Sequence, residues 1–329
     1  MSAPAAPIQI GLLLFNGFSM MAMASATEPL RAANRLRGQE FYRWHLLSPE
    51  GAPIRSSSGL ALQTSSFLDH PPRLDRVFVV ASLQIEELRD VTAHRYLQQL
   101  ALHGTLLGAV SLGTFVLARA GLLNGYQCTL HWESLRQFAE EFPEIAVSRE
   151  LYVRDRDRLT CAGGTAAMDL MLDQIASDHG GHLAADVAEQ FLHSRIRAPQ
   201  EQQRMAIHWR YGVNDARVAK AIALMEQNLE YLMSVQDIAR QCNLSVRQLE
   251  RLWRQLFDGS PQRFYMEVRL AEARRLLKES TQSIASIAMR CGFASASHLS
   301  SAYRNIHGHS PGEERRKSDR FDGATVLEK

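Results

Sequence analysis

One pattern, a short helix followed by a turn and a longer helix, occurs twice in the last third of the chain and constrains the fold more than any other feature. The two copies cover residues 235–257 and 284–307. In each copy Ile and Ala recur on one face of the first helix, and the turn is centred on a residue that tolerates a positive φ, Asn243 or Gly292. The sequence therefore predicts two helix-turn-helix units.

Serine residues and a connecting helix define how these two units are built. Ser245 and Ser295 precede the second helix of each copy, where a side-chain oxygen can accept a backbone N–H of the first turn. Between the copies, residues 261–278 begin with proline and keep apolar residues at helical spacing. A helix of that length spans about 27 Å, close to the ~34 Å between successive major-groove faces of DNA. The spacing suits two recognition helices on one side of one duplex.

The second copy contains several short matches to a known family. They are residues 283–292 (SIASIAMRCG), Phe293, residues 297–300 (SHLS), Tyr303 and residues 308–311 (GHSP). Through them residues 214–316 resemble the DNA-binding domain of the AraC/XylS family. Two positions depart from the family pattern, because Leu299 and Tyr303 stand where Phe is usual. The resemblance implies that the chain binds double-stranded DNA at a promoter operator, with RNA polymerase as a further partner.

The resemblance also indicates which residues face DNA in the first recognition helix. Physical reasoning agrees in part, because a core stripe of Leu249, Leu252, Trp253 and Leu256 would leave the other face outward. Arginine can form bidentate hydrogen bonds with guanine, and glutamine with adenine. Alternatively, the arginines form only a solvated helix face. The predicted DNA-binding residues are Arg247, Gln248, Glu250, Arg251 and Arg254.

The second recognition helix carries mostly small side chains at the corresponding positions. Its one nearby basic side chain is an arginine, so we expect weaker direct base readout and a larger share of methyl contacts and backbone positioning. The predicted DNA-binding residues are Ala296, Ser297, His298, Ser300, Ser301 and Arg304.

The first half of the chain alternates short apolar strands with helical segments. This alternation predicts βαβ units and a parallel sheet covered on both faces. A later strand pair and a long amphipathic helix follow, and the helical pattern continues from Gly180 to about Ala198. The predicted strands are residues 8–15, 43–48, 77–82, 105–110, 150–154 and 159–162, and the predicted helices are residues 25–36, 85–103, 116–120 and 165–179.

Length and charge support a division into two domains. The 329 residues exceed the ~250–300 at which single cores stop growing. Residues 213–329 carry 18 Lys and Arg against 14 Asp and Glu, whereas the rest carries 19 against 21, so the basic excess lies in the helical part. We predict an α/β domain over residues 1–198, a linker over 199–213, an all-α domain over 214–317 and a disordered tail over 318–329.

A strand-to-helix turn in the first domain resembles a second known family. The strand before Ser111 runs directly into a helix, which exposes one side chain at the carboxyl edge of the sheet. The turn, residues 118–125 (ARAGLLNG), residues 129–132 (TLHW) and residues 161–165 (CAGGT) resemble the class I glutamine amidotransferase-like, or ThiJ/PfpI, superfamily over residues 8–180. That resemblance implies a flavodoxin-like parallel-sheet sandwich, and the domain order resembles amidotransferase-like regulators within the AraC family.

The residue at this turn, a serine in place of cysteine, disfavours a catalytic role for the first domain. Catalytic members of the superfamily place Cys at the turn with His close to it, whereas this chain has Ser111 followed by Leu112. A serine hydroxyl needs a base, and no His-Asp partner can be assigned, although His131 is available. The rival interpretation is an amidase-like hydrolase that uses Ser111 and carries an appended DNA module. We predict no catalytic residues, no metal and no cofactor, and a ligand pocket at the sheet edge.

Residues 18–36 and 130–133 further resemble regulators that answer to amino acids and quaternary amines such as glycine betaine, carnitine or arginine. A cationic effector would find a counter-charge in Glu28 and a cation–π face in Trp132. Alternatively, Glu28 only lies in a helix N-terminal turn and Trp132 only packs in the core. The predicted ligand-binding residues are Glu28, Ser82, Ser111, Thr114, His131 and Trp132.

The remaining expectations follow from the same patterns. No apolar run approaches the ~20 residues that cross a bilayer, and the first residues lack the features of a secretory signal, so we expect a cytoplasmic protein without a membrane partner. The scattered Cys128, Cys161, Cys242 and Cys291 favour neither disulfides nor zinc. We expect a homodimeric, ligand-responsive activator of catabolic genes. A third interpretation is a constitutive DNA-binding protein whose sheet domain only dimerises.

Overall fold

A computed structural model describes residues 6–69, 72–82 and 89–324. The chain divides into two compact units, Met1–Arg204 and Met205–Lys329, and the division falls within residues 199–213. Each unit is described by itself below. None of the described helices is long and apolar enough to cross a membrane.

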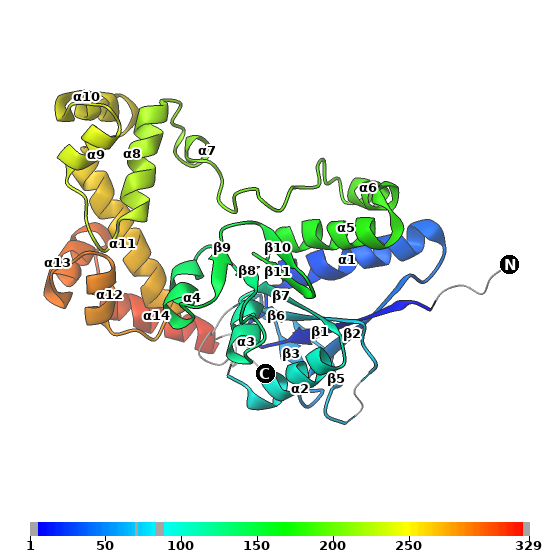
Figure 1. Cartoon of the computed structure of the whole chain (residues 1–329). Helices are drawn as coiled ribbons and strands as arrows, with labels where there is room; N and C mark the ends of the chain where they lie inside the picture. The colour runs from blue at the N-terminus through cyan, green and yellow to red at the C-terminus, as the bar shows by residue number, and fades with distance from the viewer. Residues whose placement is uncertain (1–5, 70–71, 83–88, 325–329) are drawn as a thin grey trace. The chain divides into compact units, whose positions relative to one another are not determined.

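The first unit is built on a seven-stranded sheet in the order β10-β11-β7-β6-β1-β2-β5 (Figure 1). All neighbouring strands are parallel except β10, which is antiparallel to β11. This confirms the predicted α/β sandwich. The strands are β1 (Ile8–Leu14), β2 (Tyr42–Ser48), β5 (Ser65–Ser66), β6 (Arg76–Ala81), β7 (Leu106–Ser111), β10 (Tyr152–Asp155) and β11 (Arg158–Cys161).

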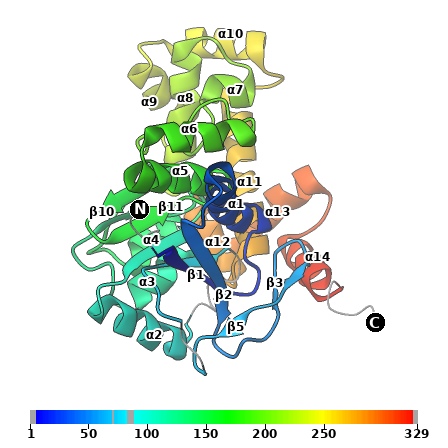
Figure 2. The ribbon, with the colours of Figure 1, turned by 90° about the vertical axis from the view of Figure 1, so that its right-hand side faces the viewer.

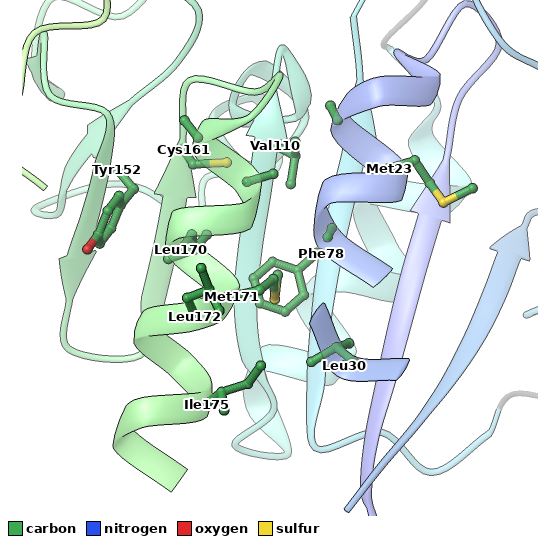
Figure 3. Close-up of a cluster of buried hydrophobic side chains, with 14 of the residues drawn as sticks. Met23, Leu30, Phe78, Val110, Tyr152, Cys161, Leu170, Met171, Leu172 and Ile175 are labelled. Atoms are coloured by element: carbon green, nitrogen blue, oxygen red, sulfur yellow. The ribbon is translucent and has the colours of Figure 1, made fainter. Parts of the chain in front are cut away.

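Helices cover both faces of this sheet, and alternate strand residues point to opposite faces. Leu12 and Leu14 pack with α1 (Met20–Arg37), α5 (Ala166–His179) and α6 (Gly181–Gln190), while Leu13 between them packs with α2 (Val91–Leu102) and α3 (Gly113–Arg119). Figure 2 shows these two helical layers on opposite sides of the strands. In the first layer, Met171 of α5 lies against Phe78 of β6 (Figure 3). Two apolar cores therefore hold the sheet.

Short elements outside the main sheet were not predicted. They are β3 (Ile54–Arg55), β4 (Ala61–Leu62), β8 (Gln127–Thr129), α4 (Leu135–Glu141) and β9 (Ala146–Ser148). The strands among them have only two or three residues and α4 has seven, which is too short for a clear periodicity. The helix α1 begins five residues earlier than predicted, because Ser19 caps it by accepting from Ala22 N. Part of the helix predicted over 85–103 falls on residues 83–88, which lie outside the described residues.

The helical pattern expected from Gly180 to Ala198 is wrong in its second half. The helix α6 ends at Gln190, and residues 193–198 have no regular secondary structure. Leu192 adopts a φ of 53°, which an α-helix does not permit. The side chains that follow are held by tertiary contacts with α5, described below, which local periodicity cannot show.

The second unit is helical throughout its described part, as predicted. One core gathers under α8, α9 and α10, and another under α12 and α13, while α11 supplies Tyr265 to the first and Leu270 to the second. Figure 1 shows the two helix pairs at the two ends of α11. The helices are α7 (Ile207–Tyr211), α8 (Ala216–Gln227), α9 (Val235–Gln241), α10 (Val246–Leu256), α11 (Pro261–Glu279), α12 (Ile284–Arg290), α13 (Ala296–His307) and α14 (Pro311–Ala324).

Two details of this unit differ from expectation. Leu256 was assigned to the core stripe of α10 but is 41% exposed, because α10 ends there and the next residue, Phe257, packs on Trp253 with ring centroids 5.1 Å apart. The tail was expected to be disordered from residue 318, whereas α14 runs to Ala324. Residues 325–329 lie outside the described residues.

Candidate functional site

The two helix-turn-helix units share one turn geometry. Asn243 and Gly292 both have positive φ, 55° and 71°. In each unit the next backbone N–H reaches back five residues, from Leu244 to Ala239 O (2.9 Å) and from Phe293 to Ala288 O (2.8 Å). A Cβ at Gly292 would also lie 2.5 Å from the Leu229 carbonyl oxygen. The left-handed turn thus sets the angle between the first and the second helix of each unit.

The second helix of each unit, α10 or α13, begins at the predicted serine cap. Ser245 Oγ accepts from Gln248 N (3.3 Å) and Ser295 Oγ accepts from His298 N (3.1 Å). At α10 the Gln248 side chain completes a capping box, because its Oε1 accepts from Ser245 N (2.8 Å). The Ser-x-x-Gln spacing in the sequence was the available signal for this second role of Gln248. The amide oxygen of Gln248 is therefore engaged within the helix, whereas no such contact engages its amide nitrogen among the described residues.

The other predicted DNA-binding residues lie on the outer faces of the two helices. Leu249, Trp253, Leu299 and Tyr303 are buried beneath them. The carboxylate of Glu250 is partly buried and lies 3.6 Å from the Arg254 guanidinium, as an i,i+4 ion pair. Ala296 and Ser300 are also partly buried. The exposed members are Arg247, Arg251, Arg254, Ser297, His298, Ser301 and Arg304.

In the first unit, the turn after β7 is a strained elbow. Ser111 ends β7 with a φ of 59°, which is uncommon for any residue other than glycine. A Cβ at Gly113 would lie 2.1 Å from Val79 O, and one at Gly163 would lie 2.6 Å from Ser111 Cβ. These two glycines allow α3 and the loop after β11 to close around Ser111. The elbow therefore stands at the carboxyl ends of β6, β7 and β11.

A buried cysteine lies beside the elbow. Cys161 at the end of β11 is 0% exposed. Burial raises the pKa of the Cys161 thiol to about 12, although the nearby backbone groups of Gly163 and Ser111 oppose the rise. The group is thus a neutral thiol at pH 7 and a poor nucleophile. His131, the candidate base, directs Nδ1 toward the Glu133 carboxylate (3.4 Å).

With this geometry in place, comparison with known proteins gives the family. Residues 9–177 match the DJ-1/PfpI family, and residues 238–317 match a helix-turn-helix domain. The HTH-type transcriptional regulator GbdR of Pseudomonas aeruginosa is 43% identical over 311 residues, which cover 94% of this chain and 84% of GbdR. The chain belongs to the AraC family of transcriptional regulators. This AraC-family regulator binds DNA, and its first unit is a DJ-1/PfpI domain.

Other relatives agree with this assignment. The HTH-type transcriptional regulator CdhR of Pseudomonas aeruginosa is 42% identical over 92% of this chain and 90% of its own length. Among solved structures, a ThiJ/PfpI family protein from Pseudomonas syringae superposes with a TM-score of 0.53 at 21% identity, over 72% of this chain and 90% of that one. That likeness shows the fold alone. The relatives are named as transcriptional regulators, and both family resemblances seen in the sequence are confirmed.

The regulator brings several of its predicted effector residues together at the sheet edge. Ser82 follows β6 and accepts from Ser19 N at the start of α1 (3.0 Å). Ala81 is the register partner of Ser111 on the neighbouring strand. Thr114 is fully buried, and its hydroxyl donates to Thr129 O (2.9 Å) two residues before His131. The elbow and the segment after β8 are thus tied to one another.

Two predicted effector residues have partners that the sequence did not indicate. Glu28 lies about 12 Å along α1 from its first residue and pairs with Arg31 at 2.7 Å, with 42% of its side chain exposed. Trp132 is partly buried, and the guanidinium of Arg204 lies 4.5 Å from the centre of its ring. The aromatic face assigned to a cationic effector therefore already holds a cation, while the assigned counter-charge is on the helix surface.

The turn of the second helix-turn-helix unit of the regulator is held by a buried arginine that sequence reasoning missed. Arg269 of α11 is 6% exposed and donates to the carbonyl oxygens of Cys291 (2.8 Å) and Gly292 (2.7 Å). Its guanidinium lies 4.1 Å from the Phe293 ring centre. Burial lowers the pKa of Arg269 from its usual value. These contacts cap the C-terminal end of α12 and orient α13.

Replacing Arg269 by methionine should destabilise the helical unit by about 1.5–3 kcal/mol, because two carbonyl groups lose a charged donor. Chemical denaturation monitored by circular dichroism checks this. Arg263→Met is the matched control, since Arg263 is on the same helix, is 65% exposed and pairs only across one turn with Glu267. Equal stability of the two variants would contradict a capping role for Arg269.

Proposed function

We propose that the regulator senses an amino acid or quaternary amine at the carboxyl edge of its DJ-1/PfpI sheet and activates catabolic genes in response. The observation that carries this proposal is the Trp132 ring, which is tied through Thr129 and Thr114 to the elbow and which accepts a cation in the structure. Trimethylammonium and guanidinium groups are both suited to such a face. Relatives over the helical part include RhaS of Klebsiella pneumoniae, which is named a transcriptional activator and is 37% identical over 106 residues.

On DNA, we propose that α10 and α13 are the recognition helices. The arginines of α10 are the best candidates for direct base contacts, and α13 with its serines is better suited to backbone positioning. The helix α11 between the two units has 19 residues and spans about 28 Å. Residues 199–213 serve as the linker. We further propose that the regulator works as a homodimer with RNA polymerase at its promoter, in the cytoplasm where the DNA is.

The effector class can be tested by thermal unfolding of the full-length protein with glycine betaine, dimethylglycine, carnitine and arginine. A true effector at 100 times its Kd should raise the free energy of unfolding of the sheet domain by ~2.7 kcal/mol. Trp132→Ala should remove the shift. Trp209→Ala is the control, because Trp209 is a 72% exposed tryptophan in the other unit. No shift with any of these compounds would be evidence against the cationic class.

We propose no catalytic role for Ser111. The elbow geometry alone favours one, but this chain has serine where catalytic members of the superfamily have cysteine, and the neighbouring Cys161 is a buried, neutral thiol. Within the described residues, no group of three or more His, Cys, Asp or Glu side chains could hold a metal ion. Turnover of simple amides by the purified protein, abolished in Ser111→Ala, would establish the hydrolase reading instead.

A further inference from the structure

The last residues of the first unit are docked on the segment that follows β8. Gln203 Nε2 lies within hydrogen-bond distance of Thr129 Oγ1 (3.1 Å), Leu130 O (3.0 Å) and Glu150 O (2.9 Å). Its neighbour Arg204 places its guanidinium 4.5 Å from the Trp132 ring centre. The chain therefore leaves the sheet domain across the residues assigned to the effector site.

Two backbone contacts extend this docking toward the start of the linker. Leu151 N donates to Pro199 O (2.9 Å), and Glu150 forms an isolated antiparallel bridge with Gln202. We call residues 199–204 the exit segment. Its contacts with the segment after β8 and with the residues just before β10 are this short strand-like pairing, one amide side chain and one stacked arginine, while Glu201 pairs with Arg195 just before the exit segment (2.7 Å).

The docked state also contains an unfavourable feature. Gln203 Oε1 is buried and has no hydrogen-bond partner in the part of the chain that the structure describes. A buried acceptor without a donor loses its hydration and gains nothing in return. This cost partly offsets the favourable free energy of docking the exit segment. A ligand of moderate affinity can therefore shift the segment between docked and released states.

We propose that Arg204 is an internal competitor of the effector: a cationic effector displaces its guanidinium from Trp132 and so releases the exit segment from the sheet domain. This inference rests on the proposed function, because it needs a cationic effector at this site. The competition has a chemical basis, since a guanidinium and a substituted ammonium bind the same electron-rich ring face and cannot occupy it together.

Release of the exit segment lengthens the flexible connection, or tether, between the sheet domain and the DNA-binding unit. The exit segment is immediately followed by Met205, the first residue of the second unit. Freeing six residues adds up to ~20 Å of extended chain between the two units. In the proposed homodimer, a longer tether changes the effective concentration at which the DNA-binding units of the two protomers meet adjacent sites on DNA. Effector binding and DNA binding are thereby coupled through one arginine side chain.

The test uses the full-length protein and the variant Arg204→Met, which keeps the length of the side chain and removes its charge. The probes are tetramethylammonium chloride, glycine betaine and arginine, and binding is measured by calorimetry. Loss of the internal competitor should raise the affinity for the bound probe about 2-fold to 30-fold, the range expected from cation–π energies. Without any probe, the DNA affinity of Arg204→Met should approach that of the wild type saturated with probe.

Hydrogen exchange of the Leu151 amide reports docking directly, because this amide donates to Pro199 O. Its exchange should become faster when the wild type binds the probe and should already be fast in Arg204→Met. Arg43→Met is the matched control, since Arg43 is an exposed arginine of the same unit (54% exposed) that pairs with Glu40 and not with the exit segment or Trp132. The control should bind the probe with wild-type affinity and keep the Leu151 amide protected.

Different outcomes would contradict the competition by Arg204 and the cationic class of the effector. If a probe binds the wild type but Arg204→Met shows the same affinity and the same Leu151 exchange, the competition is overturned and the effector class stands. If no probe binds either protein, the effector class is overturned and the competition falls with it.

Discussion

Replacing Arg247 and Arg251 together by alanine should weaken binding of the regulator to its operator by about 2–6 kcal/mol, roughly 30-fold to 10⁴-fold in Kd. Both side chains are exposed one turn apart on α10, above the buried Leu249 and Trp253. A bidentate arginine–guanine pair contributes ~1–3 kcal/mol of discrimination. The measurement is fluorescence anisotropy at fixed salt, on a site selected from random duplex DNA.

The same experiment separates base contacts from phosphate contacts. Loss of base contacts relaxes sequence preference at defined positions, whereas loss of phosphate contacts weakens all sequences alike and lowers the salt slope by about one for each arginine. Arg217→Ala is the control for charge, because Arg217 lies on α8 and pairs with Asp215 at 2.7 Å. Unchanged affinity and footprint in the double variant would show that α10 is not the recognition helix.

Replacing Asp169 by alanine should destabilise the sheet domain by about 3–5 kcal/mol, the usual cost of breaking a buried ion pair. Asp169 is 0% exposed in the first turn of α5. It accepts from Arg197 Nη2 (2.6 Å), Arg197 Nε (2.9 Å) and Arg197 N (2.8 Å), and it lies 2.9 Å from His193 Nε2. Without the carboxylate, a partly buried guanidinium and a backbone N–H lose their acceptor.

Urea unfolding of the full-length protein checks the Asp169 prediction, with tryptophan fluorescence and circular dichroism compared to separate the two units. Asp173→Ala is the control, since Asp173 lies one turn later on α5, is 34% exposed and is 3.7 Å from Arg154. The control should lose at most ~1 kcal/mol. A loss in Asp169→Ala no larger than in the control would mean that the segment after α6 is held by other contacts.

The sequence predicted elements well where a few neighbouring residues carry the pattern. The strand expected over residues 8–15 is Ile8–Leu14, the one expected over 105–110 is Leu106–Ser111, and the connecting helix expected over 261–278 is Pro261–Glu279. The helix-turn-helix repeats, their serine caps and the exposed face of α10 were predictable for the same reason. Helical and strand periods, caps and turns depend on residues within about five positions of each other.

The candidate effector site was predictable in its place but not in its contacts. A strand running into a helix at Ser111 indicates the sheet edge, because the carboxyl ends of parallel strands meet there. Glu28, which we expected to be the counter-charge of the effector, instead forms an ion pair with Arg31 one turn away on the same helix. The cation on Trp132 comes from Arg204, 72 residues later in the chain, and nothing in the local pattern of either residue indicates the other.

By itself, then, the sequence determined the α/β and all-α units, their order, the doubled helix-turn-helix and the exposed face of α10. Those features follow from short-range spacing and from the conformations that glycine, proline and serine favour locally. Only the tertiary structure decided that Asp169 holds Arg197, that Arg269 caps the turn at Gly292 and that Arg204 occupies Trp132. Charged side chains choose partners by proximity in the folded chain, and folding brings together residues that the sequence keeps far apart.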